Sequence, residues 1–201
     1  MSQLPPAFAI QSARIRSNAP NFASESKNLI TNARRIPAQR WEFVLRSKPM
    51  LAEQVLAAFA WQAGLKGSHG VFTAVIPYYS HTKGVGSGSP TVRTAASPGA
   101  TSIQLQGFSG PVVGQLKAGD FIKFGNHSKC YMVLADVNSN VNGQLTIQIF
   151  PELRKPLTVG TAVQINNVPF TLRQRGDIQE FNADGRDGRI STLELDCYEA
   201  L

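Results

Sequence analysis

The chain has 201 residues, of which 42% are hydrophobic and 16% charged, with a formal net charge of +7 at pH 7. This length suits one large domain or two small ones, and the apolar fraction is enough to bury a core. No run of about 18 apolar residues could cross a membrane and the N-terminus has no secretory signal pattern, so we expect a protein made in a cytoplasm with no membrane partner.

The first 77 residues predict strands around one helix. Segments 8–17 and 41–46 alternate apolar and polar residues, as half-buried strands do. A helix is expected over 49–63, because Pro49 suits the first turn of a helix, where a backbone N–H would have no partner. Helical spacing directs three of its side chains inward, and we expect them to pack on the sheet that holds Trp41 and Phe43: Leu51, Val55 and Phe59. A buried strand over 71–77 follows.

The composition changes after this first part. Residues 80–100 are rich in Gly, Ser, Thr and Pro, which predicts a linker or flexible loop. Short alternating segments follow, separated by turn residues such as Asn142 and Gly143: 101–108, 120–125, 129–137, 144–151 and 162–167. Strands this short and this closely spaced predict a small sandwich or barrel.

The last segment, 189–199, alternates again and is expected to return to the first sheet. We therefore predict a mainly β protein with one main α-helix: a β-sheet or sandwich domain packed by that helix, plus an inserted small β-sandwich or barrel. Residues 1–86 with 173–201 are expected to form the first domain, and residues 87–172 the insertion.

No pattern in the sequence predicts catalysis, a cofactor or a metal. Three histidines lie beside Gly or Ser without metal-ligand spacing, so we expect exposed turn residues: His69, His81 and His127. The glycine-rich segment 84–88 lacks the Gly-Lys-Ser/Thr ending and the helix of a phosphate loop. Arginines interrupt the calcium-loop-like run 182–189, which favours a hairpin turn with Asp-Gly pairs.

The two cysteines carry little information. Cys130 and Cys197 have no Cys-x-x-Cys pattern, so a zinc or redox site is not expected. Two free buried thiols are the expectation for a reducing cytosol, and a disulfide between them stays open.

Charge is distributed unevenly along the chain. Residues 1–50 and 51–176 each carry a net charge of +6, whereas residues 177–201 carry −5. The arginines lie on strand-like segments without a zinc finger, helix-turn-helix or aromatic-basic motif, so nucleic acid is not an expected partner. Basic and acidic segments are expected to attract each other within a subunit or across a subunit interface. The candidate interface charges are Arg14, Arg16, Arg34, Arg35, Asp184, Asp187, Glu194 and Glu199.

A longer pattern extends over roughly residues 40–200. It begins with RWEFVLRSKPMLAEQVLAAFAWQAGLKGSHGVFTAVIP over 40–77: a strand with Trp-x-Phe, a Pro-Met helix and a strand ending in Pro. It continues with a set of shorter matches in order: Leu116–Asp120, Tyr-Met-Val at 131–133, Asp136, Asn142-Gly143, Ile149–Arg154, Pro156 and Cys-Tyr-Glu at 197–199. Together these segments resemble bacteriophage tail-tip proteins of the distal tail or minor tail type.

The resemblance implies a structural virion protein that forms a homo-oligomeric ring, commonly a hexamer. Such a ring connects the tail tube to the tail hub, baseplate or receptor-binding apparatus. It would assemble in the host cytoplasm and remain in the phage tail, with no enzymatic activity and no cofactor. The alternative is a carbohydrate-binding or receptor-adhesion module of the tail tip, which needs exposed aromatic residues near a groove, whereas Trp41 and Trp61 are expected in the core.

Overall fold

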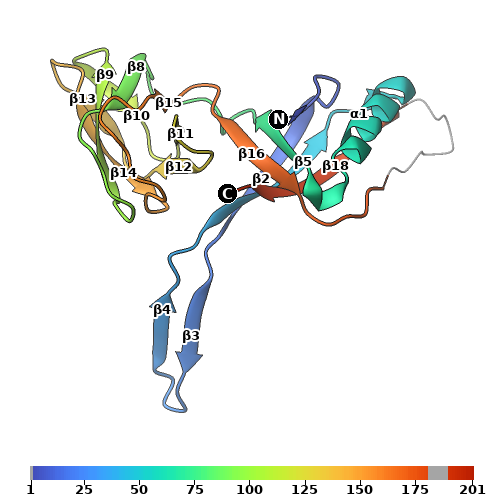
Figure 1. Cartoon of the computed structure of the whole chain (residues 1–201), viewed down its shortest axis with the longest axis horizontal. Coiled ribbons are helices and arrows are strands. Elements are labelled where there is room, and N and C mark those ends of the chain that lie inside the picture. The colour runs from blue at the N-terminus through green and yellow to red at the C-terminus, as the bar shows by residue number, and fades with distance from the viewer. Residues whose placement is uncertain (1, 181–189) are drawn as a thin grey trace.

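The computed structural model describes residues 2–180 and 190–201, and this part of the chain contains two six-stranded sheets (Figure 1). The first sheet is mixed, because β1 and β7 are parallel while the other neighbours are antiparallel. Its order is β1 (Ser2–Gln3), β7 (Val71–Val75), β16 (Pro169–Gln174), β18 (Glu194–Glu199), β5 (Arg40–Ser47) and β2 (Ile10–Asn18).

The helix α1 (Ala52–Gly64) packs on this sheet, and a short 3-10 turn, η1 (Gly67–His69), follows it. Val55 is fully buried, Phe59 is half-buried against the same core, and the Trp61 ring meets Phe72 edge-on at 5.2 Å. The prediction for Leu51 was wrong.

Leu51 is 59% exposed because the helix starts after it. The backbone is still extended there: β6 (Met50–Leu51) pairs with β17 (Ile190–Ser191). The side chain of Gln54 then accepts the Leu51 N–H at 3.2 Å, which caps the first turn. Pro49 consequently lies outside the helix rather than in its first turn.

The second sheet is antiparallel and nearly closed into a barrel. Its order is β15 (Val163–Gln164), β11 (Phe121–Phe124), β12 (Cys130–Val133), β14 (Leu145–Phe150), β9 (Ser102–Phe108) and β8 (Gly88–Val92). A bridge between Thr91 and Ala162 brings its two edges together. A smaller sheet of β10 (Val112–Leu116) and β13 (Val137–Ser139) accompanies it.

The segment 80–100 is part of this barrel, so the prediction of a linker or flexible loop there was wrong. It contains β8, and buried Asp120 holds its first residues. The Asp120 carboxylate accepts hydrogen bonds from the Thr82 hydroxyl at 2.5 Å and from the backbone N–H of Lys83 at 2.8 Å. Composition could not indicate this anchoring, because its partner lies almost 40 residues away.

The predicted fold class is confirmed: the chain is mainly β, with one α-helix and a barrel-like second sheet. All strands of that second sheet lie between Gly88 and Gln164. Strand β16 belongs to the first sheet, although its residues 169–172 fall in the predicted insertion 87–172. The division into a discontinuous domain and an insertion stays a prediction.

Two hydrophobic cores share the wall between the sheets. Along β11, Phe121 faces the first core and Ile122 the second, and Cys130 and Tyr131 of β12 alternate in the same way. Trp41 from the first sheet meets Phe121 edge-on at 5.1 Å. The period of two in a strand therefore explains how one barrel wall serves both cores.

Candidate functional site

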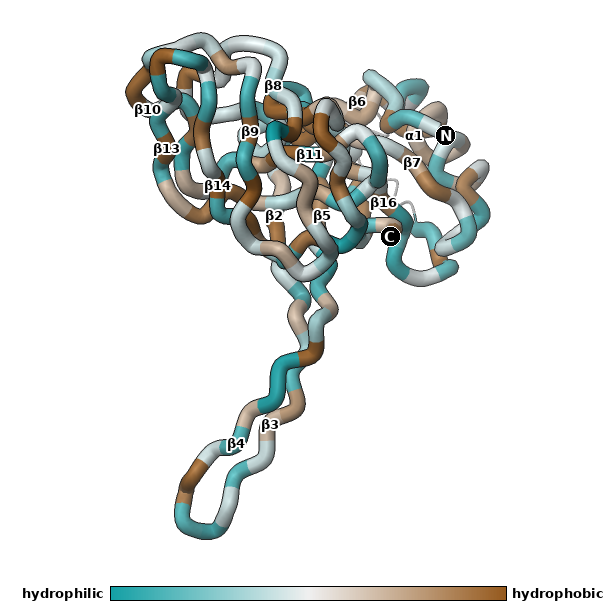
Figure 2. The backbone as a smooth tube through the Cα atoms, turned by 60° about the vertical axis from the view of Figure 1, so that its left-hand side comes forward, coloured by the Kyte–Doolittle hydropathy of each residue, from teal (hydrophilic) through white to brown (hydrophobic). Residues whose placement is uncertain are grey.

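A two-stranded hairpin projects away from both sheets. Strands β3 (Asn21–Glu25) and β4 (Thr31–Arg35) pair only with each other, and Figures 1 and 2 show them extended from the body. All ten strand residues are exposed. We call residues 19–37 the arm. An isolated two-stranded hairpin is marginally stable in water.

Three large apolar side chains of the arm face solvent: Phe22 is 68% exposed, Leu29 79% and Ile30 60%. Leu29 lies at the turn with a φ of 60°, a left-handed conformation that a leucine rarely adopts. Its N–H donates to the carbonyl oxygen of Ser26 at 2.9 Å, which closes the turn. Glycine would fit this position without strain, whereas leucine carries a backbone cost of about 1–2 kcal/mol here.

The sequence did not predict the arm. A strand is recognised by alternation between a buried and an exposed face, but both faces of β3 and β4 are exposed, so no alternation exists. The only available signal was the polar run Ser26-Lys27-Asn28, which is typical of a turn between two short strands.

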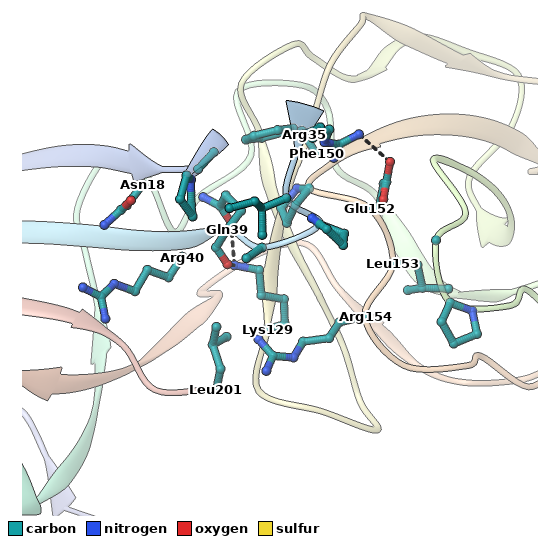
Figure 3. Close-up of a pocket in the computed structure, with 18 of the residues that line it drawn as sticks. Asn18, Arg35, Gln39, Arg40, Lys129, Phe150, Glu152, Leu153, Arg154 and Leu201 are labelled. Carbon is teal, nitrogen blue, oxygen red and sulfur yellow. Dashed lines mark hydrogen bonds and ion pairs between the residues drawn. The ribbon is translucent and has the colours of Figure 1, made fainter. Parts of the chain in front are cut away.

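A groove of about 790 Å³ lies at the base of the arm, between it and the barrel (Figure 3). An ion pair of 2.5 Å between Arg35 of the arm and Glu152 of the barrel spans its two walls. Most of its wall is apolar. Four lining residues are prolines, and three are larger apolar residues: Pro20, Pro37, Pro98 and Pro151, with Ile36, Phe150 and Leu153. Arg40, Lys129 and Arg154 add positive charge to it, so the groove is apolar with a basic margin.

Beneath the groove, a buried polar cluster joins the two sheets. The Lys129 ammonium is 2% exposed and donates to the Glu199 carboxylate and, at 2.7 Å, to the side-chain oxygen of Gln39. The same carboxylate accepts the backbone N–H of Cys130 at 2.8 Å and that of Trp41 at 3.3 Å. Burial raises the pKa of Glu199 and lowers the pKa of Lys129, and the opposite charge of each partner counteracts the shift.

The predicted interface residues are not all brought together. Arg14 and Arg16 are exposed on the edge strand β2, and Glu194 is exposed on β18. Strand β5 separates them, because Glu194 pairs with Arg46 of β5 and Arg14 with Val44. These side chains therefore do not form one continuous row of charge on a single strand pair.

The remaining predicted charges lie elsewhere. Arg34 is exposed on the arm, and Arg35 is engaged by Glu152 of the same chain. Glu199 is buried against Lys129, which corrects its assignment to a subunit interface: its position at the end of a half-buried strand places it in the polar cluster. Asp184 and Asp187 lie outside the described residues.

His127 was predicted as an exposed turn residue, but it is half-buried beside the barrel. Its Nε2 lies 2.7 Å from the Tyr131 hydroxyl and its Nδ1 lies 2.5 Å from the side-chain oxygen of Asn126. Tyr131 accepts the Arg154 N–H and can donate its proton to Nε2, so a neutral ring satisfies both contacts. Burial, and then the charges of Lys155 and other nearby cations, lower the pKa of His127 to about 4.

This lowered pKa predicts how stability depends on pH. An unfolded histidine binds a proton near pH 6.5, whereas folded His127 resists it until about pH 4. The stability from the neutral ring is therefore present above pH 6.5 and lost as the pH falls toward 4. We expect the thermal midpoint of the native chain to fall more steeply over this range than that of H127Q. Parallel curves for the two proteins would contradict this account.

The described residues include no metal-binding cluster and no exposed thiol. No group of three or more His, Cys, Asp or Glu side chains in 2–180 and 190–201 is arranged to hold a metal ion. Cys130 and Cys197 are free and buried, and burial raises the pKa of both thiols. No helix of the described chain is long and apolar enough to cross a membrane.

No protein-family model matches the chain, and no curated protein matches it either.

Proposed function

We propose that this chain is a structural subunit of a bacteriophage tail, which forms a closed homo-oligomeric ring between the tail tube and the baseplate or tail tip. Its function lies in contacts between subunits rather than in catalysis, and it requires no cofactor. Six copies are the expected number, from the resemblance of residues 40–200 to tail-tip proteins. The ring would assemble in the host cytoplasm and remain in the virion.

The exposed arm is the observation that carries this proposal. A hairpin with Phe22, Leu29 and Ile30 in solvent exposes apolar surface that a partner can bury. A projecting element and the surface it contacts are different parts of the molecule, so the contact can repeat head-to-tail from copy to copy as well as close reciprocally in a dimer. Head-to-tail contacts produce a ring when the rotation between neighbours closes.

The edges of the two sheets support the same proposal. The barrel brings its edges together through Thr91 and Ala162, whereas β2 leaves a nine-residue edge on the first sheet. An open strand edge presents unpaired N–H and C=O groups to a neighbouring chain. Arg14 and Arg16 give this edge a positive charge, which limits pairing to partners that tolerate or neutralise it.

No specific observation favours the carbohydrate-binding alternative. Among the described residues, the large apolar side chains exposed on the barrel are aliphatic: Val85, Val113, Leu134, Val141 and Val159. The exposed aromatic rings lie elsewhere, Phe22 on the arm and Tyr78 before the barrel. Trp41 is buried between the two sheets, and the half-buried Trp61 donates its indole N–H to the Ser2 hydroxyl at 2.7 Å. Flat sugar faces are bound by exposed aromatic rings, which the described residues of the barrel do not offer.

The mass of the purified chain in solution tests the proposal. We expect light scattering to give a particle of several subunits, and electron microscopy to show closed rings. Reversing Arg14 and Arg16 to glutamate should weaken assembly only modestly, because exposed charge pairs contribute about 0–1 kcal/mol each. Raising the salt concentration should also weaken assembly modestly, because ions screen exposed charge pairs over about 10 Å at 0.1 M.

The matched control is R93E, a charge reversal at an exposed position of the barrel. It should leave the particle mass unchanged. A chain that stays monomeric at every concentration and turns over a small substrate would overturn the proposed function.

A further inference from the structure

The arm carries an apolar tip at one end and borders an apolar groove at the other. Leu29 and Ile30 form the tip, whereas Pro20 and Ile36 at the arm's base line the groove. The two ends are separated by the five-residue strands β3 and β4, which span roughly 17 Å at about 3.3 Å per residue. While the strands stay paired and extended over this length (Figure 1), the tip of an arm lies too far from the groove at its own base to enter it.

We propose that the tip of one copy's arm occupies the groove at the base of another copy's arm. This inference rests on the proposed self-assembly and names the surfaces that meet. The donor surface is Leu29 and Ile30, and the acceptor is the groove between the arm and the barrel. Each copy has one tip and one groove, so the contact repeats from copy to copy.

The groove has the size and chemistry to receive this tip. Its volume of about 790 Å³ accommodates several side chains, and its walls are mostly apolar. Four of the lining residues are prolines, whose φ is fixed, and the Arg35–Glu152 ion pair links the arm wall to the barrel wall. A preformed rigid site loses little entropy on binding, which favours a small apolar tip as its occupant.

The backbone of Leu29 supports a role for its side chain beyond the fold of the arm. Its φ of 60° disfavours leucine, and the side chain makes no buried contact in the single chain, being 79% exposed. Residues in sparsely populated backbone conformations cluster at binding and active sites. Burial in a neighbour's groove would offset the backbone cost at this position.

One pair of opposite charges is available to this contact, although Lys27 of the tip and the basic margin of the groove carry like charge. Glu25, at the tip end of β3, is the arm's single carboxylate. Arg154 lies at the groove, and its guanidinium makes no ion pair within the described residues (Figure 3). With the tip of one copy in the groove of the next, Glu25 and Arg154 are the available opposite charges. The double variant E25R/R154E should therefore recover assembly that either single reversal weakens.

Disulfide trapping tests the proposal directly. The variant L29C/A38C places one thiol on the tip and one on an exposed residue that lines the groove. The control L29C/V113C moves the second thiol to an exposed barrel residue away from the groove. Both native thiols are buried, which keeps them out of the exchange. Under mild oxidation, we expect covalent multimers at least tenfold more abundant in L29C/A38C than in the control.

The outcomes of this experiment distinguish the docking of the tip from the formation of the ring. Rings that form without selective cross-linking overturn the docking of the tip and leave the ring standing. A disulfide within one chain, seen as a monomer without reactive thiols, also overturns it. Cross-linking that stops at a dimer supports the docking but contradicts the ring. A chain that never associates contradicts both.

A glycine substitution distinguishes docking from folding. L29G relieves the unfavourable φ and should leave the thermal midpoint unchanged or raised. If the side chain docks in a neighbour, the same variant should weaken association about tenfold or more. An L29G chain that assembles like the native chain would overturn the role of the tip.

Discussion

Replacing Glu199 by alanine is expected to destabilise the chain by about 3–5 kcal/mol, the typical cost of removing one partner of a buried ion pair. Lys129 would keep its charge in a site that is 2% exposed, with Gln39 as its remaining partner. The backbone N–H groups of Trp41 and Cys130 would also lose their acceptor. The free energy of unfolding, measured with urea for E199A and the native chain, gives the difference.

The matched control is E194A, on the same strand but exposed. It should change stability by less than about 0.5 kcal/mol. The double variant K129M/E199L removes both charges and should recover much of the lost stability, because well-packed apolar replacements of buried pairs are often neutral. A loss below about 1 kcal/mol in E199A would mean that the cluster does not hold the two sheets together.

The second large effect is expected in assembly rather than in folding. The triple variant F22S/L29S/I30S removes the exposed apolar surface of the arm. Burying one such side chain contributes about 1.5–3 kcal/mol, so association should weaken by more than about 100-fold. The stability of the single chain should be nearly unchanged, because all three side chains are exposed in it. Sedimentation at several concentrations measures the shift.

A triple change on the barrel provides the control. V113S/V141S/V159S removes three exposed valines, at 83%, 75% and 62% exposure, outside the arm and the groove. It should assemble as the native chain does. Equal weakening in both triple variants would show that general surface polarity, rather than the arm, governs association.

The pattern of alternation was sufficient for much of the fold. It predicted the core strands of both sheets, for example 41–46 and 144–151, which the structure has as Arg40–Ser47 and Leu145–Phe150. It also predicted a helix after Pro49, though the helix begins three residues later, at Ala52. These elements are half-buried, so their apolar residues recur with the period of a strand or a helix.

Less of the candidate site than of the fold could be predicted from the sequence. The arm has no buried face, so it has no period to detect. Glu199 was taken for a surface charge because carboxylates are almost never buried unless paired. Its partner Lys129 lies 70 residues away, and only the approach of β12 to β18 brings them together. The groove likewise combines the arm, the barrel and Leu201, which are distant in sequence.

The sequence by itself determined the fold class, the helix, the short strands of the barrel and the return of the C-terminal segment, because each depends on local periodicity and turn residues. Tertiary structure alone decided the three features of the candidate site: the exposed arm, the groove at its base and the buried Lys129–Glu199 pair. Each depends on which distant segments meet or fail to meet, and burial of that kind leaves no local pattern in the chain.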